Sequence, residues 1–335
     1  MLYYDSLKYE AVANIISNNI GERKLVLLQD NESIRKLLLE KYSIEKIEII
    51  NWNRDELCRG GTRFYKLLNL ASRADEYFIC NMLPQYDIEL KKEIENLGYK
   101  EFQDYVFAYH KRLVLPPGTR DYSDEYGNNI ISTGNFQVTL APLAGNCFVN
   151  IDDSTSVGNN SNIVMGECNG IIKIGKKCKF DYNAHLELFL DAKIEIHEKS
   201  TFTGNFKARA TGGSIISIGK DCMFSNDVEV YVGDGHSIFS IEARERTNEC
   251  YPHNTKNEIL IGNHVWVGLR SIILGCRIGN NSIIGAGAVI KGDIPESCVV
   301  VGNPGVIKRR GVTWSRDNYT RDIGTCREDF EIINL

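Results

Sequence analysis

The sequence lacks the features that define several large classes of protein. Its 335 residues carry a net charge of −5, so there is no basic excess to form a nucleic-acid surface. The first dozen residues have neither the basic segment nor the apolar core of a signal peptide, and no apolar run approaches the roughly 18 residues that span a bilayer. We therefore expect a cytoplasmic protein with no nucleic-acid partner and no membrane span.

The ten cysteines lack the spacing of a metal or redox motif. Cys168 and Cys178 are the nearest pair and lie ten positions apart, so there is no CxxC unit. Without a secretion signal, scattered cysteines indicate reduced thiols. Several fall within the repeat described below, which predicts a packing role for them and no metal site.

Residues 1–115 alternate between short apolar runs and segments with helical periodicity. Strands are expected at 25–29, 44–50, 76–82 and 105–109, and helices within 31–42 and 84–99. This order predicts a small α/β domain with a Rossmann-like parallel sheet. The turn after the first strand, Gln29-Asp30-Asn31-Glu32, has no glycine to cradle a phosphate, so a docking or specificity role is at least as consistent as nucleotide binding. The segment 115–119, with two adjacent prolines and a glycine, marks the boundary.

Residues 130–310 repeat with a period of six. An aliphatic or aromatic residue is often followed by Gly or Asp, and a small residue takes the fifth place, as in Ile174-Gly-Lys-Lys-Cys178 and Ile218-Gly-Lys-Asp-Cys222. One inward apolar residue in six marks one short strand, and three hexapeptides make a coil of about 18 residues. A β-sandwich would instead alternate with period two. We expect the glycines to supply backbone conformations closed to other residues, and residues 311–335 to leave the repeat as a tail or cap.

Successive coils are not equally long. They begin at Ile151, Ile174, Ile196, Ile218, Ile261 and Ile278. The wide interval from Ile218 to Ile261 predicts that one coil extrudes a loop of about 25 residues, and such insertions are where solenoids usually place function.

This part of the chain resembles the hexapeptide-repeat acyltransferases, in the branch of galactoside, maltose and xenobiotic acetyltransferases and their capsule-sugar relatives. The resemblance lies in Asp234-Gly-His236-Ser-Ile238, Asn263-His-Val-Trp266-Val-Gly268, Ile284-Gly-Ala286-Gly-Ala288-Val, Asp293-Ile-Pro295 and Gly302-Asn-Pro304. It implies a left-handed parallel β-helix, a homotrimer, and acetyl-CoA lying between two subunits. It also implies a saccharide or nucleotide-sugar acceptor, such as a surface polysaccharide or its precursor.

His236 is the predicted general base. Its position in the motif matches the family's base, and a neutral imidazole can take the proton of a sugar hydroxyl as that oxygen attacks a thioester. Asp234 is predicted to orient the ring, although a carboxylate so close in sequence is also a common turn former. Among the other histidines, His253 in the same loop is the main competitor. His264 takes a variable position of its hexapeptide, and we expect it to face outward.

The resemblance also implies contacts to the co-substrate. Trp266 is expected near the acyl chain and pantetheine, and small residues are expected to keep the wall beside them low. Cations are expected near the phosphates of coenzyme A, although the family usually has Thr-Lys where this chain has Lys291-Gly292. The predicted cofactor-binding residues are Trp266, Gly268, Gly285, Ala286, Gly287, Lys291, Lys308 and Arg309.

The leading prediction is an acetyl-CoA-dependent O-acetyltransferase that acts on a sugar hydroxyl, and three alternatives remain open. The same base and co-substrate suit N-acetylation of an amino-sugar. A metalloenzyme of the γ-carbonic-anhydrase kind shares the β-helix but needs three converging histidines, here His236, His253 and His264. A non-catalytic sugar-binding solenoid is the third alternative.

Overall fold

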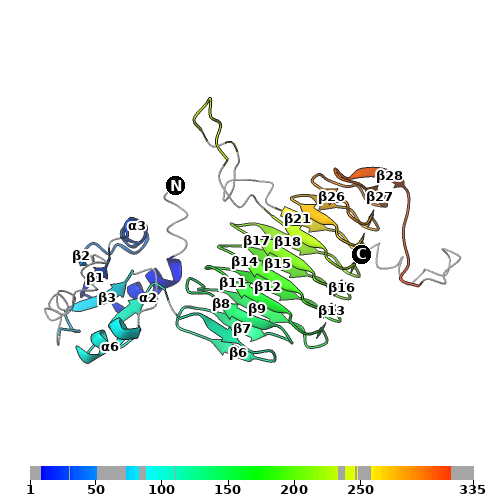
Figure 1. Ribbon diagram of the computed structural model, residues 1–335. Coiled ribbons are helices and arrows are strands. Elements are labelled where there is room, and N and C mark those ends of the chain that lie inside the picture. The colour runs from blue at the N-terminus through cyan, green and yellow to red at the C-terminus, as the bar shows by residue number, and fades with distance from the viewer. Residues whose placement is uncertain are drawn as a thin grey trace. The chain divides into compact units, whose positions relative to one another are not determined.

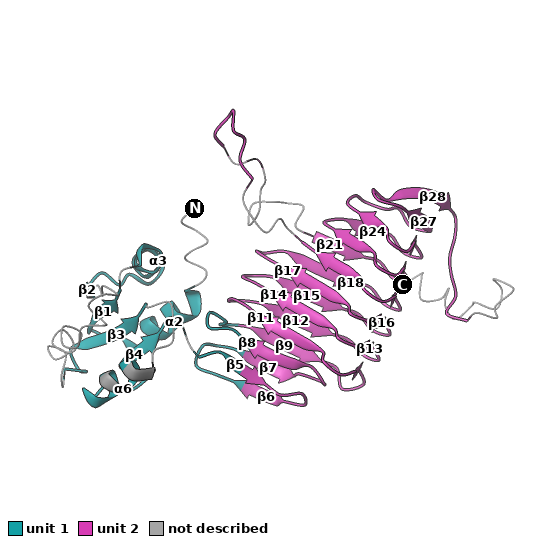
Figure 2. Cartoon of the chain, viewed as in Figure 1, with its two compact units in different colours: residues 1–113, 123–128, 140–146 teal, residues 114–122, 129–139, 147–335 magenta. Residues whose placement is uncertain are grey.

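The computed structural model describes residues 9–29, 31–50, 73–82, 88–109, 111–232, 238–245, 247 and 258–317. The chain divides into two compact units, coloured separately in Figure 2. One unit holds residues 1–113, 123–128 and 140–146, and the other holds 114–122, 129–139 and 147–335. Within the described ranges, no helix is both long and apolar enough to span a membrane.

The first unit contains a four-stranded parallel sheet in the order β2-β1-β3-β4. Its elements are α2 (Glu10–Asn19), β1 (Lys24–Leu28), α3 (Glu32–Tyr42), β2 (Ile47–Ile50), β3 (Tyr77–Asn81), α6 (Ile88–Asn96) and β4 (Tyr105–Phe107). The alternating pattern is confirmed, and Asn31 caps α3 by accepting a hydrogen bond of 3.1 Å from the N–H of Ile34. Helix α2 was not predicted, although its buried Val12, Ile15 and Ile16 follow helical spacing.

The second unit is a parallel β-helix made of three eight-stranded sheets, and Figure 1 shows its coils stacked in sequence order. Sheet I contains β10 (Ser156–Val157), β13 (Lys179–Tyr182), β16 (Thr201–Gly204), β19 (Met223–Phe224), β22 (Trp266–Val267), β25 (Ile283–Ile284), β27 (Cys298–Val301) and β28 (Val306–Arg310). Sheet II contains β5 (Leu113–Leu115), β8 (Gln137–Leu140), β11 (Asn162–Met165), β14 (His185–Leu188), β17 (Lys207–Ala210), β20 (Glu229–Tyr231), β23 (Ile272–Leu274) and β26 (Val289–Ile290). Sheet III contains β6 (Arg120–Ser123), β7 (Asn129–Ser132), β9 (Phe148–Ile151), β12 (Ile171–Ile174), β15 (Lys193–Ile196), β18 (Ile215–Ile218), β21 (Glu258–Ile261) and β24 (Arg277–Ile278).

The six-residue period sets the core of the β-helix. Each strand pairs with the equivalent strand of the next coil, so Phe180 lies beside Phe202 and Phe202 beside Phe224. The three rings are buried, and their centroids are 4.4 and 4.8 Å apart in stacked arrangements. Identical positions of successive coils therefore form continuous apolar columns, as stacking of repeats requires.

The corner glycines are present for a different reason from the predicted one. The left-handed backbone conformation falls on the fourth hexapeptide residue, which is Lys177, Lys199, Asp221, His264, Asn281 or Ser297 at the edge between sheets III and I. At Gly219 a Cβ atom would lie 2.4 Å from the carbonyl oxygen of Gly262, and at Gly279 it would lie 2.3 Å from the amide nitrogen of Glu296. These glycines are needed because the next coil approaches so closely, so the conformational prediction was wrong at these corners.

Insertions gather at the edge between sheets II and III. Residues 166–170, 189–192 and 211–214 lengthen the turns there in three successive coils. The long insertion begins at the same edge, because the chain leaves β20 and returns to the helix at β21. Residues 238–245, which belong to its described part, project from the coils in Figure 1.

The β-helix ends in a strand of opposite direction. β28 pairs antiparallel with β27 and so closes the edge of sheet I. The chain then turns at Gly311, where φ is +69°, and the N–H of Val312 donates to the carbonyl oxygen of Ser297. Residues 312–316, called the strap below, run back past the corners of earlier coils.

Candidate functional site

Trp266 lies on the outer face of sheet I. In β22 its neighbour Val267 points into the core, so the indole points outward and is 37% exposed. Met223 of β19 and Ile283 of β25 occupy the same register in the adjoining coils. An exposed indole flanked by apolar side chains offers a rigid surface for an apolar ligand.

Gly268 allows the coils beside Trp266 to approach closely. Its N–H donates a bond of 2.7 Å to the carbonyl oxygen of Ile284, and a Cβ atom there would lie 2.6 Å from the amide nitrogen of Ala286. The Ser271 hydroxyl donates to the Gly268 carbonyl oxygen at 2.8 Å. Coil packing therefore accounts for this glycine without a ligand.

Gly287 has no such packing constraint. Its φ is +70°, and no atom lies within 4 Å of the place where a Cβ atom would stand. Ala286 beside it is exposed, and the N–H of Gly285 donates at 2.8 Å to the carbonyl oxygen of Val300. A side chain at position 287 would project outward from the corner, so its absence leaves the wall low.

The equivalent corner residues of earlier coils are polar and form a column. The Asn183 amide donates to Asn205 at 3.0 Å, and the Asn205 amide donates to Asp227 at 2.7 Å. Arg270 pairs with Asp227 at 3.7 Å. The next position in this column is Gly287, so the column of side chains stops where the wall of the predicted coenzyme A site begins.

The predicted phosphate-binding cations do not gather at one edge. Lys308 and Arg309 are exposed on β28 of sheet I, where Arg309 pairs with Val299. Lys291 is exposed directly after β26, at the edge between sheets II and III. Within one chain, Lys291 therefore belongs to a different edge of the β-helix from the other two.

The predicted base lies outside the described residues, as do Asp234 and His253. The chain leaves the coil after β20 and Val232, at the edge between sheets II and III. In a three-sided helix that edge is opposite sheet I, which carries Trp266. The described tip of the loop exposes Ile238, Phe239 and Ile241.

His264 does not face solvent, and its predicted exposure was wrong. It occupies an outer corner position as expected, but the strap covers it and its side chain is fully buried. Its Nδ1 lies 2.7 Å from Oδ2 of Asp221, and its Nε2 lies 2.9 Å from the carbonyl oxygen of Trp314. The indole of Trp314 stacks on the imidazole at 4.2 Å and donates from Nε1 to the His264 carbonyl oxygen at 2.8 Å.

Asp221 joins this corner to the end of the strap. Arg316 donates from Nε to Oδ1 of Asp221 at 2.7 Å, and its Nη groups donate to Thr201 and to the carbonyl oxygen of Cys222. Burial favours a raised pKa for Asp221, but the hydrogen bond from His264 and the charge of Arg316 outweigh it. The pKa of this carboxyl therefore lies below its usual value.

The contacts of His264 are relevant to the alternative function, a metalloenzyme of the γ-carbonic-anhydrase kind. It requires His264 as one of three ligands, yet both ring nitrogens of His264 already face hydrogen-bond acceptors. Of the other histidines, His197 is exposed and Nδ1 of His185 contacts the amide oxygen of Asn162. His110 lies outside the described residues.

The buried thiols behave as packing residues. Cys178 and Cys222 fill the fifth hexapeptide place and donate to carbonyl oxygens of the next coil at 3.0 and 3.1 Å. Burial raises the pKa of Cys178 to about 11 and that of Cys222 to about 12. Thiols with such pKa values are poor nucleophiles, so the predicted packing role is confirmed.

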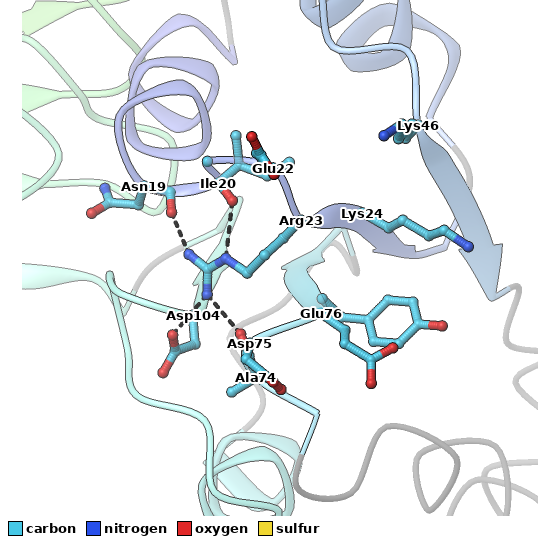
Figure 3. Close-up of a pocket in the computed structure, with 12 residues that line it drawn as sticks. Asn19, Ile20, Glu22, Arg23, Lys24, Lys46, Ala74, Asp75, Glu76 and Asp104 are labelled. Carbon is cyan, nitrogen blue, oxygen red and sulfur yellow. Dashed lines mark hydrogen bonds and ion pairs between the residues drawn. The ribbon is translucent and has the colours of Figure 1, made fainter.

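The first unit contains a hollow of about 840 Å³, shown in Figure 3. It lies at the amino ends of the strands, since Lys24 and Tyr77 begin β1 and β3. Arg23 spans it, donating to the carbonyl oxygens of Ile20 and Ala74 and to Asp104. Parallel sheets bind ligands at the carboxyl ends of their strands, so we assign this network to structure.

Comparison with known proteins gives a family. No family model matches the sequence. The chain is 31% identical over 126 residues to the polysialic acid O-acetyltransferase of Escherichia coli O1:K1 / APEC. The matched region covers 37% of this chain and 39% of that relative. It is 30% identical over 172 residues to the polysialic acid O-acetyltransferase of Neisseria meningitidis. That matched region covers 47% of this chain and 71% of the relative.

A solved structure confirms the fold. The crystal structure of the polySia-specific acetyltransferase NeuO has a TM-score of 0.51 and 24% identity, and covers 61% of this chain and 91% of that one. The fold and the Neisseria match together place the chain in the hexapeptide-repeat acyltransferases, with a left-handed parallel β-helix. Within that family it is similar to sugar O-acetyltransferases, including the galactoside O-acetyltransferase of Escherichia coli (strain K12), at 32% identity over 128 residues covering 38% of this chain and 60% of that relative.

Proposed function

We propose that the chain transfers an acetyl group from acetyl-CoA to a sugar hydroxyl, on a surface polysaccharide or its precursor. The observation that carries this proposal is the match to the Neisseria enzyme over 71% of its length. Two of the similar relatives are named as polysialic acid O-acetyltransferases, which favours an acidic saccharide as the acceptor. Their names also favour O-acetylation over N-acetylation.

His236 is the proposed general base. Its imidazole takes the proton of the acceptor hydroxyl while the hydroxyl oxygen attacks the carbonyl carbon of the thioester. The tetrahedral intermediate then collapses, the C–S bond breaks, and the imidazolium returns the proton to the departing thiolate. The products are an acetyl ester and coenzyme A, and Asp234 is proposed to orient the imidazole.

Sheet I and its corner form the proposed acetyl-CoA surface. Trp266 supplies an exposed apolar face on sheet I, and Gly287 leaves the corner between sheets I and II open. Gly268, Gly285 and Ala286 complete the low wall. Lys291, Lys308 and Arg309 are proposed to neutralise the phosphates.

We propose that the chain acts as a homotrimer, and the arrangement of its edges favours a site shared between copies. The loop that carries His236 leaves the helix at the edge opposite Trp266. Two copies of the chain could bring the loop of one beside sheet I of the other, and Lys291 beside Arg309. We therefore propose that each site lies between neighbouring subunits. We place the reaction in the cytoplasm, where acetyl-CoA is available.

Thiol release from acetyl-CoA tests the proposal. The acceptors are polysialic acid, a neutral galactoside and an amino-sugar, each tested with the unsubstituted chain and with His236→Ala and His253→Ala. Acceptor-dependent release that falls by about 10² to 10⁴-fold in His236→Ala alone supports the base, because general base catalysis contributes that much. Equal loss in His253→Ala alone would move the base to that residue.

A further inference from the structure

We propose that Trp314 is a positioning residue for Trp266, and that a doubly protonated His264 holds the strap which carries it. The proposal rests on the proposed acetyl-CoA site and adds the strap to that site. None of the motifs that identify the family includes the strap, which contacts the β-helix only because the chain turns back after β28.

Trp314 links a buried histidine to the exposed indole. One face of its ring stacks on His264 at 4.2 Å with an angle of 7°. Its centroid lies 6.1 Å from that of Trp266 at an angle of 49°, within the range of aromatic contacts. Trp314 itself is only 7% exposed, so it supports Trp266 from the side of the III–I edge and is not itself an open ligand surface.

The hydrogen bonds of His264 favour its charged form. A neutral imidazole has one N–H donor and one acceptor nitrogen, whereas an imidazolium has two donors. Here Nδ1 faces the carboxylate of Asp221 and Nε2 faces the carbonyl oxygen of Trp314, and both of these groups are acceptors. Either neutral tautomer would set a lone pair against an acceptor, at 2.7 Å or at 2.9 Å.

Charged groups of both signs lie around His264, and the carboxylate of Asp221, which faces it directly, favours the imidazolium, whereas burial and the nearby Arg316 oppose it. In the preceding coil, Asp221 contacts His264 directly. The neighbouring Lys220 instead forms an ion pair of 3.3 Å with Glu198. From the following coil Asn281 and Ser282 are neutral. From the strap, the Arg316 guanidinium lies 5.6 Å from the Trp314 ring and binds the second oxygen of Asp221.

The protonation state therefore controls how firmly the strap is held. Because the docked strap favours protonated His264, docking is complete below the ordinary histidine pKa of about 6.5, as long as Asp221 stays ionised, and weakens as rising pH removes the proton. A loosened Trp314 would leave Trp266 free to move, which would weaken binding of coenzyme A.

The first test measures coenzyme A binding by calorimetry in Trp314→Ala and Trp314→Phe. We expect the dissociation constant to rise about tenfold in Trp314→Ala and to be largely restored in Trp314→Phe, which keeps an aromatic ring for stacking. Acrylamide quenching of Trp266 fluorescence is compared between two double variants, Trp52→Phe/Trp314→Ala and Trp52→Phe/Trp314→Phe. Trp266 is the only tryptophan in both. More quenching in the alanine variant supports the contact, and equal quenching overturns it.

The second test varies pH from 6.5 to 8.5 in His264→Asn. Asparagine suits this left-handed corner, as Asn281 shows one coil later, but it carries no charge. We expect coenzyme A affinity to fall with pH in the unsubstituted chain and in His197→Asn, an exposed control. In His264→Asn it should be weak throughout, with the pH dependence reduced. Identical pH profiles in all three proteins would overturn the role of His264.

Failure of the two proposals is distinguishable. If the unsubstituted chain binds no coenzyme A, the proposed function falls, and with it the role of the strap in binding. The quenching experiment still decides whether Trp314 positions Trp266, because it needs no ligand.

Discussion

Two glycines on the proposed acetyl-CoA wall should respond to substitution in opposite ways. In Gly268→Ala the new methyl group would meet backbone atoms of the next coil, with the amide nitrogen of Ala286 at 2.6 Å and the carbonyl oxygen of Ile284 at 2.8 Å. An ordinary contact begins at about 3.4 Å. The coils must therefore separate by several tenths of an ångström, which lengthens the 2.7 Å bond from the N–H of Gly268.

The expected cost of Gly268→Ala is about 1–3 kcal/mol, the usual range for overpacking. For a domain of this size each kcal/mol lowers Tm by roughly 2–4 °C. Gly287→Asn should cost less than about 1 kcal/mol, because asparagine tolerates a positive φ and the space is open. It should instead weaken coenzyme A binding about tenfold, equivalent to about 1.4 kcal/mol, because it extends the polar column into the wall.

Calorimetric unfolding and coenzyme A titration of both variants check this pair. A lowered Tm with near-normal binding is expected for Gly268→Ala, and the reverse for Gly287→Asn. An unchanged Tm in Gly268→Ala would refute the close-approach argument, and unchanged affinity in Gly287→Asn would refute the placement of the ligand wall.

Three further predictions concern the interior and the strap. Phe202→Ala removes the middle ring of the buried stack, so chemical denaturation should show a loss of about 3–5 kcal/mol, and a loss under 1 kcal/mol would contradict the account of the core. At pH 8 the thiols of Cys178 and Cys222 should not react with a disulfide reagent until the chain unfolds, because burial raises their pKa values to about 11 and 12; rapid labelling of the native protein would argue against this. The folded state lowers the pKa of Asp221, so this carboxyl stabilises the fold above its ordinary pKa of about 4, and that stabilisation is lost as pH falls through the lower folded value. Asp221→Asn should therefore flatten the acid side of a plot of Tm against pH. An unaltered acid side would count against the network.

The architecture could be predicted because its cause is local and repeated. One apolar residue in six places columns such as Phe180, Phe202 and Phe224 inside the helix, whatever the handedness. The packing role of the small residue at the fifth place could also be predicted, and Cys178 and Cys222 are both buried there.

The corner chemistry could not be predicted from single hexapeptides. Whether a glycine serves conformation or close approach depends on atoms one coil away, as at Gly219 and Gly262. The burial of His264 depends on Trp314, which lies 50 positions later and belongs to no repeat. A lone tryptophan beyond the last hexapeptide, followed by Arg316, was the available signal that the tail returns to the helix.

The central claim is that the chain esterifies a sugar hydroxyl by way of His236. The most direct measurement incubates polysialic acid with isotope-labelled acetyl-CoA and follows the label on the saccharide by mass spectrometry, before and after mild base. We predict base-labile label with the unsubstituted chain and almost none with His236→Ala. Label that resists mild base, or that persists in His236→Ala, would contradict it.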